Sequence, residues 1–249
     1  MSPAAYVEMA QVQSTHWWYV ARRSILRNQL RSLALPRDAE ILEIGSGTGA
    51  NLDLLAEFGH VLGLEMADDA IRLASQRTGA TATSIVLRQG RCPEDLPALA
   101  QRFDLICLFD VLEHIDEDEL SLARLRQMLK PGGRLMLTVP AYPWMWSPHD
   151  LHVHHKRRYT RRSLATRCSR AGLVVTRMSH FNTLLFPLAL AERIYEKLSG
   201  RRTSATSTPA AAINGFFTRV FALERLLMAH VSLPFGLSLF VLAGPRADA

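Results

Sequence analysis

The chain has little lysine, few cysteines and no long uninterrupted hydrophobic run. Its cysteines, Cys92, Cys107 and Cys168, are three in number and widely spaced, so they match neither a disulfide framework nor a zinc pattern and favour a reducing compartment. Of its 249 residues, 21% are charged and 48% are hydrophobic, ordinary values that exclude disordered and fibrous proteins. We therefore expect a globular domain that buries its core without covalent staples.

The amino-terminal residues lack the basic-then-apolar order of a signal peptide, so the cytoplasm is the predicted location. Between Arg225 and Arg246 the chain has no Asp, Glu, Lys or Arg, which is the length of a membrane span. Pro234 and Gly236 would break a helix there. Residues 237–242 are therefore predicted to form a final buried strand rather than part of a transmembrane helix.

The formal net charge is +6, and nearly all of the cations are arginine, because Lys130, Lys156 and Lys197 are the only lysines. A basic surface attracts nucleic acid, anionic lipid or anionic small molecules. Composition alone does not choose among these partners.

Apolar runs alternate with helical segments from residue 39 onward, which predicts an α/β fold with a mainly parallel sheet covered on both faces. Strands are expected at residues 40–44, 60–65, 84–89, 103–109, 134–139, 173–179 and 237–242. Helices are expected at residues 6–13, 22–35, 51–58, 68–77, from 116 to an end at 130–133, 160–171, 184–198 and 216–230. One domain is predicted, with a helical cap (1–38), a core (39–182 and 233–249) and a helical insert (183–232) that contains a polar loop at 201–212.

A glycine-rich turn, with Gly45, Gly47 and Gly49, follows the first strand. Glycines let the backbone bend tightly and bring its N–H groups against a ligand at the start of a helix. The strand ends in an acid, Glu43, which suits a cationic or zwitterionic ligand better than the pyrophosphate of a dinucleotide. Glu65 ends the second strand, where a carboxylate can accept hydrogen bonds from both hydroxyls of a ribose.

With these features the chain resembles the class I S-adenosylmethionine (SAM) dependent methyltransferases over nearly its whole length. The matching segments are residues 41–49, 65, 89–97, 103–107, 110–114 and 129–133, in the order and spacing typical of that family. The segment from Asp110 to His114 is most similar to the small-molecule group that includes ubiquinone-biosynthesis O-methyltransferases. The resemblance implies a Rossmann-like, seven-stranded sheet with a reversed last strand, and SAM as the cofactor.

The resemblance also implies a cofactor site around the glycine turn. Gly45, Ser46 and Gly47 would face the methionine part of SAM, while Glu43 would orient its ammonium group. The other implied contacts are Glu65 to the ribose, Met66 to the adenine, and Phe109 and Asp110 beside the sulfonium. An amino-terminal lid would bring Tyr19 and Arg22 onto the cofactor, with the arginine meeting its carboxylate, and simple packing of this aromatic segment is the alternative.

The adenine end departs from the family pattern. Where the family often has an acid that accepts from the adenine amino group, this chain has Arg91. The backbone of Cys92 is expected to contact the adenine, and the sequence leaves open which acid assists.

A phenol or alcohol acceptor needs a base, whereas a free amine does not. The candidate bases are His114, after the fourth strand, and His149 and His152, after the fifth. Asp110, Glu113 and His114 are spaced to share the opening turn of a helix, where a general base, a divalent-cation site and a purely structural cap all remain open. We assign no metal site, because the histidines at 152–155 lack a fourth ligand at zinc spacing.

The segment after the fifth strand is strongly basic, since residues 151–170 contain seven Lys or Arg, three His and no acid. Aromatic residues precede it, and they can wall a pocket while arginines recognise a phosphate or carboxylate. The predicted substrate residues are Tyr142, Trp144, Trp146, His154 and Arg158. The alternative is a solvated basic face with the two tryptophans in the core.

The preferred function is methyl transfer, by in-line displacement, to an O or N atom of a small-molecule or lipid-like acceptor. A nucleic-acid methyltransferase is an alternative, disfavoured because residues 109–112 lack the Asn/Asp-Pro-Pro-aromatic segment of base amino-methyltransferases. A non-catalytic SAM-binding partner protein is another. The apolar insert is expected to be a lid or homodimer face, or else to admit a lipid tail or rest on a membrane beside Arg201, Arg202 and Arg219.

Overall fold

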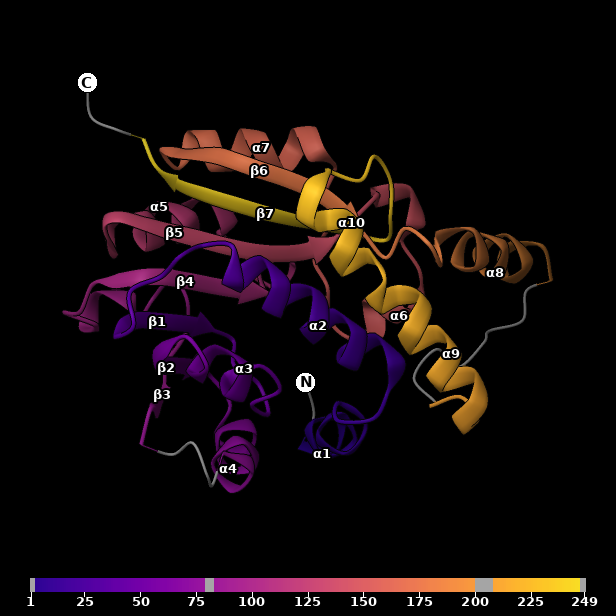
Figure 1. Cartoon of the computed structure of the whole chain (residues 1–249), viewed down its shortest axis with the longest axis horizontal. Coiled ribbons are helices and arrows are strands. Elements are labelled where there is room, and N and C mark those ends of the chain that lie inside the picture. The colour runs from indigo at the N-terminus through magenta and orange to yellow at the C-terminus, as the bar shows by residue number, and fades with distance from the viewer. Residues whose placement is uncertain (1–2, 79–82, 200–207, 247–249) are drawn as a thin grey trace.

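The structure, a computed structural model, describes residues 3–78, 83–199 and 208–246. Its centre is a seven-stranded sheet of order β3-β2-β1-β4-β5-β7-β6 (Figure 1). The strands are β1 Ala39–Ile44, β2 Gly59–Glu65, β3 Ile85–Gln89, β4 Phe103–Phe109, β5 Leu129–Pro140, β6 Leu173–Phe181 and β7 Ser238–Pro245. Strands β1 to β5 pair in parallel, and β7 runs antiparallel to both β5 and β6. The predicted sheet with a reversed last strand is confirmed.

Helices precede the sheet, connect its strands and fill the interval between β6 and β7. The α-helices are α1 Pro3–Val12, α2 Trp17–Arg31, α3 Leu52–Ala56, α4 Asp68–Arg77, α5 Asp118–Gln127, α6 Pro148–His152, α7 Arg161–Arg170, α8 Phe186–Ser199, α9 Ala211–Ala222 and α10 Glu224–His230. Short 3₁₀ turns are η1 Leu96–Ala98, η2 Leu112–His114 and η3 Pro143–Met145. None of the helices in the described ranges is both long and apolar enough to cross a membrane.

Side chains of the central strands alternate between two hydrophobic clusters, one on each face of the sheet. On β1, Leu42 belongs to one cluster and Ile41 to the other. Apolar residues of α5 and α7 complete the first cluster, whereas α2, α3, α9 and α10 complete the second. Figure 1 shows α2 and α10 lying across one face of the sheet. Both faces are therefore buried, as a parallel sheet requires.

Several predicted boundaries were wrong. The helix expected to end at residues 130–133 ends at Gln127, and those residues form the first part of β5, where a register shift against β4 accommodates them. Helix α2 begins at Trp17, because the aromatic residues expected to join two helices are themselves helical. The single helix predicted at residues 216–230 is in fact two helices, α9 and α10, which meet at Leu223. The first of them begins at Ala211, five residues earlier than predicted. Most of the loop expected at 201–212 lies outside the described residues.

Strands β1 and β2 approach each other closely at Gly59. A Cβ added at this position would lie 2.1 Å from the carbonyl oxygen of Ala39, its neighbour on β1. We expect Gly59→Ala to lower the free energy of unfolding by about 2–3 kcal/mol through overpacking, measured by urea unfolding. The matched control is Gly215→Ala in α9, where an added Cβ meets nothing within 4 Å. That variant should gain about 0.5–1 kcal/mol in helix stability, and equal effects of the two would contradict the prediction.

Candidate functional site

The glycine turn joins β1 to α3 at the carboxyl edge of the sheet. The amide of Gly45 donates to the carbonyl of Leu64 on β2, with 2.7 Å between N and O. Gly45 and Gly47 have φ angles of +65° and +53°, a region that side chains with a Cβ rarely adopt. A Cβ at Gly45 would also lie 2.7 Å from the side chain of Val111, so glycine is required there on two grounds.

Glu43 is buried directly beneath this turn, at the end of β1. Its Oε1 accepts a hydrogen bond from Asn51 Nδ2 at 2.9 Å, while its Oε2 has no partner among the described residues. Burial raises the pKa of this carboxyl to about 7. A buried acid with one free oxygen suits a cationic group, which would restore its ionised form.

Glu65, at the end of β2, holds the turn from the other side. Its two oxygens accept from the amides of Gly47 at 2.9 Å and Ala67 at 3.0 Å. Ser46, between the two glycines, is buried, and its hydroxyl has no partner within the part of the chain that the structure describes. The Glu65 carboxylate thus fixes the turn, and the turn carries one buried hydroxyl, that of Ser46, with no hydrogen-bond partner among the described residues.

Helix α2 covers the end of β4 through Arg22. Arg22 Nη2 lies 3.0 Å from Asp110 Oδ2, and the guanidinium sits over the rings of Trp18 at 4.7 Å and Phe109 at 5.7 Å. Asp110 has a φ of +58°, a strained conformation for a residue with a side chain. Tyr19, on the same helix, is partly buried, and burial raises its pKa. The sequence-predicted residues of the lid and of strand four therefore meet in one place.

The residues predicted to contact the adenine, Met66, Arg91 and Cys92, do not form a compact cluster of buried side chains. Met66 is exposed, and so is Arg91, whose backbone amide donates to Asp95 Oδ2 at 2.7 Å. Cys92 is partly buried against the hydrophobic core, and burial raises the pKa of its thiol to about 12. Asp95 is the acid that the geometry places beside Arg91.

A second polar cluster lies just beyond Asp110. Glu113 and His114 are not on the opening turn of a helix, as predicted, but on the separate turn η2, before α5. The His114 ring lies 4.8 Å from the ring of His155, between centroids, and Nε2 of His155 is 3.7 Å from Glu113 Oε1. Glu113 is fully buried, and neither of its oxygens has a hydrogen-bond partner among the described residues. Burial, reinforced by nearby Asp110, raises the pKa of Glu113.

Hydrogen bonds orient both imidazoles of this cluster. His114 Nδ1 lies 3.2 Å from the carbonyl oxygen of His154, which only accepts, so a neutral His114 carries its proton on Nδ1 and offers Nε2 as an acceptor. Burial lowers the pKa of His114 to about 4, so it is neutral at pH 7. His155 Nδ1 is held at 2.8 Å by Asp150 Oδ1. Such an arrangement can accept a proton or hold a metal ion, since ligand atoms of Glu113, His114 and His155 lie within 4.8 Å of one another.

Asp150 organises the basic segment around this cluster. The fully buried carboxylate accepts from the amide of Ser147 at 2.8 Å, from His155, and from Arg158 Nε at 2.7 Å. These donors hold the pKa of Asp150 well below its usual range, even though burial alone would raise it. Arg158, predicted to bind substrate, is thus engaged within the protein and also donates to the carbonyl of Ala141 at 3.1 Å.

The other predicted histidines lie at different depths. His149 is partly buried, with its ring 6.5 Å from that of His155, and burial lowers its pKa. His152 and His154 are exposed. Among the histidines predicted as bases, His114 is thus the one packed directly against His155. The sequence analysis considered His155 only as one member of the histidine group and did not single out Asp150. The available signal was that Asp150 is an acid directly before twenty residues that contain none.

An aromatic wall stands at the end of β5. Tyr142 stacks on His180 at 5.4 Å between ring centroids and lies 5.3 Å from Trp144 and 5.8 Å from Phe186. Trp144 is 54% exposed, so the alternative that it belongs to the core is wrong, whereas Trp146 is partly buried. The sequence analysis missed His180 and Phe186, because they come from β6 and α8.

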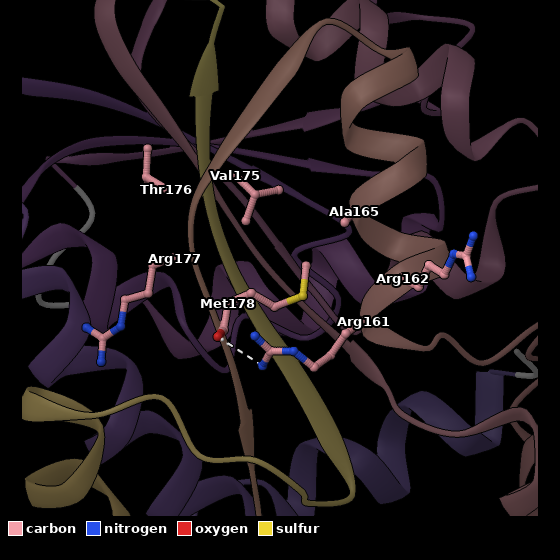
Figure 2. A pocket seen from close by; sticks show the side chains of 7 residues that line it. All are labelled: Arg161, Arg162, Ala165, Val175, Thr176, Arg177 and Met178. Atoms are coloured by element: carbon pink, nitrogen blue, oxygen red, sulfur yellow. Dashed lines mark hydrogen bonds between the residues drawn. The ribbon is translucent and has the colours of Figure 1, made fainter.

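A hollow of about 420 Å³ lies elsewhere, between α7 and the edge strand β6 (Figure 2). Its lining residues are Arg161, Arg162, Ala165, Val175, Thr176, Arg177 and Met178. Arg161 Nη1 donates to the carbonyl of Met178 at 3.1 Å, and Arg177 Nη1 to Gln29 Oε1 at 2.8 Å. Three strands, β4, β5 and β7, separate β6 from the glycine turn after β1, so this hollow is not part of the candidate site.

Comparisons with known proteins bear on the family and the fold of the chain. Residues 16–177 match a family model described as a methyltransferase domain. A ubiquinone biosynthesis O-methyltransferase of Azorhizobium caulinodans is 30% identical over 109 residues, 43% of this chain and 43% of that protein. The matches to such curated relatives span about half of the relatives' length.

Solved structures share the fold at low sequence identity. A chain in the complex of the Haloferax volcanii Trm112 methyltransferase activator with a methyltransferase has a TM-score of 0.64 at 16% identity, covering 99% of this chain and 96% of that one. The glycopeptide N-methyltransferase MtfA, solved with SAM, has a TM-score of 0.55 at 15% identity, covering 90% and 94%. The chain therefore belongs to the methyltransferase-domain family, with the fold of the class I SAM-dependent methyltransferases.

Proposed function

We propose that the protein transfers a methyl group from SAM to an O or N atom of a small-molecule or lipid-like acceptor. The observation that carries the proposal is a group of buried polar atoms near the glycine turn that have no hydrogen-bond partner among the described residues, namely Glu43 Oε2, Ser46 Oγ and Arg22 Nε. Buried polar groups without partners are rare in folded proteins, and a polar ligand accounts for all of them together. The family match gives the reaction class.

The residues present fit SAM. Glu43 would receive its ammonium group, Arg22 its carboxylate, and Glu65 its ribose hydroxyls, for which each carboxylate oxygen keeps a lone pair beside its bond to a backbone amide. SAM, when bound, would supply the methyl group of its sulfonium: the acceptor atom would bond to the methyl carbon in line as the carbon–sulfur bond breaks, and the sulfur would leave as a neutral thioether. The protein's share is to align the acceptor, exclude water and take up a proton where the acceptor is a hydroxyl.

The cluster of Glu113, His114 and His155 is our candidate for proton uptake. It adjoins Asp110, the residue that the family resemblance places beside the sulfonium. His114 offers a neutral acceptor nitrogen, and His155 is oriented by Asp150 in the manner of a catalytic acid–histidine pair. His152 is exposed and is not part of this cluster, so we propose that it takes no part in proton uptake.

The aromatic wall supports an acceptor with a ring or an apolar tail. Tyr142, Trp144 and Phe186 present flat apolar surfaces beside the basic segment. Nucleic acid remains the disfavoured acceptor, because Arg158 and Arg157 of that segment are engaged by Asp150 and Asp118 rather than free for phosphates. We place the protein in the cytoplasm, with its insert contacting either a membrane surface or a second copy.

Glu65 provides the first test. We expect Glu65→Ala to weaken SAM binding by about 3 kcal/mol, roughly a hundredfold, because charge-assisted ribose bonds are lost. Isothermal calorimetry measures the affinity directly. Glu65→Gln should lose less, since its carbonyl still accepts from the Gly47 amide, and exposed Glu57→Ala should lose nothing. An unchanged affinity in Glu65→Ala would overturn the ribose assignment.

Arg22 is the second test. Arg22→Ala and Arg22→Lys should both weaken SAM binding about tenfold or more, because lysine keeps the charge but not the planar stack on Trp18 and Phe109. Arg27→Ala, on the same helix but in an exposed pair with Glu57, is the matched control. Decarboxylated SAM should bind wild type and Arg22→Ala equally. If Arg22→Ala weakens this analogue as much as SAM, Arg22 does not meet the carboxylate.

The histidine cluster gives a kinetic prediction. With a hydroxyl acceptor found by radiolabelled methyl transfer, His114→Asn or His155→Asn should lower kcat/KM about a hundredfold or more, and His152→Asn should leave it unchanged. If His114 is the base, the acid limb of kcat/KM lies near pH 4, where its lowered pKa protonates it, rather than near the ordinary histidine value. Full activity of both cluster variants would show that no histidine of the cluster takes up the proton.

A further inference from the structure

Helices α9 and α10 form nearly one continuous helix with apolar residues on two opposite sides. Leu223, between them, keeps helical angles, so the helical phase carries through. On the inner side, Phe217, Phe221 and Met228 are spaced by four and seven residues, which keeps them on one side of a helix. All three belong to or pack against the second hydrophobic cluster. Trp17 of α2 contacts both Phe217 and Phe221, at 5.7 and 5.9 Å between ring centroids. Packing of this inner side against α2 and the sheet holds the insert in its position in the fold.

The outer side is also apolar, but nothing in the described part of the chain covers it. Its large hydrophobic residues are Ile213, Phe216, Leu223, Leu226 and Leu227, which we call the bare face. Successive members are three, seven and three residues apart, and Leu227 directly follows Leu226. Such spacings keep the five side chains on one side of the helix. Phe216 is 59% and Leu226 56% exposed. Large apolar residues gathered in this way mark an interaction surface rather than chance exposure.

Charge indicates what the bare face meets. Arg219 lies within it, and α9 contains no acid. The one acid of α10, Glu224, is fully buried and accepts from the amides of Thr183 at 2.7 Å and Leu184 at 2.8 Å. The outer side therefore combines exposed apolar residues with a cation and no exposed carboxylate.

A second copy of the chain fits this surface poorly. A two-fold contact places the same patch on both sides of the interface, so the Arg219 side chains of both copies would be covered in an interface whose patches contain no exposed acid to pair them. An anionic bilayer takes the same groups without conflict, since acyl chains accept the apolar residues while headgroups attract the arginine.

We propose that the bare face of α9 and α10 docks on the surface of an anionic lipid bilayer. The position of these helices gives the docking a consequence for the site. Asn214 of α9 accepts from the amide of Trp17 at 2.8 Å and donates to the carbonyl of Thr15 at 2.9 Å, which ties the insert to the start of the α2 lid. Figure 1 shows α8 and α9 beyond the carboxyl ends of β4 and β5, where the candidate site lies. Docking would hold the entrance of the site near the lipid.

Vesicle flotation of the full chain tests the proposal without any need for methyl transfer. The vesicles are phosphatidylcholine alone, and phosphatidylcholine mixed with phosphatidylglycerol. We expect flotation with the anionic vesicles, reduced by high salt, and about tenfold or more weaker binding for Phe216→Glu and Leu226→Glu. Val86→Glu, which alters an equally exposed apolar residue on β3, is the matched control and should float like wild type. Circular dichroism and SAM binding confirm that each variant is folded.

Three outcomes would overturn the proposal. One is no flotation of the wild type, and another is flotation that Phe216→Glu and Leu226→Glu leave unchanged. The third is a dimer, seen by sedimentation equilibrium without lipid, that those two substitutions dissociate, because the bare face would then be an interface between copies. Equal flotation with neutral and anionic vesicles would contradict the role given to Arg219.

Discussion

The requirement that both faces of a parallel sheet be buried governs the arrangement of the other elements. One face takes α5 and α7, and the opposite face takes α2, α3, α9 and α10. Because α2 is committed to covering the sheet, its first turns extend over the carboxyl edge and place Arg22 against Asp110. The same demand draws α9 and α10 onto α2. The lid of the site and the insert are thus consequences of one packing constraint.

The carboxyl edge gathers buried acids in unequal surroundings. Each oxygen of Glu65 and Asp150 accepts at least one hydrogen bond, whereas Glu43 Oε2 and both Glu113 oxygens have no hydrogen-bond partner among the described residues. A buried carboxylate that lacks donors has a raised pKa and favours a cation or a proton as its partner. The contrast fits the proposed roles, in which Glu43 receives the ammonium group of SAM and Glu113 belongs to the cluster for proton uptake, while the fixed carboxylate of Glu65 receives the ribose hydroxyls.

Much of the fold could be predicted from the sequence because its signals are local. Alternating apolar runs, the glycine turn and the acids that end β1 and β2 each lie within a few residues, and their order predicted a mainly parallel sheet. The reversed last strand was implied by the family resemblance, and the structure confirms it. The errors occurred where local signals conflict with tertiary pairing. Residues 130–133 are typical of a helix end, yet pairing with β4 draws them into β5. A helical pattern after strand four was expected to carry Glu113 and His114, but they occupy the separate turn η2.

The sequence by itself determined the family, the glycine turn and the presence of acids at the strand ends, because each depends on short-range chemistry. Only the tertiary structure decided which distant side chains meet. His155 joins Glu113 across 42 positions of the chain, Asn214 joins Trp17, and His180 stacks on Tyr142. Such contacts depend on how β5, β6 and the insert fold back over the same edge. The hydrophobic periodicity of a single segment does not predict that these elements come together at one edge, because their arrangement results from the burial of whole faces of the sheet.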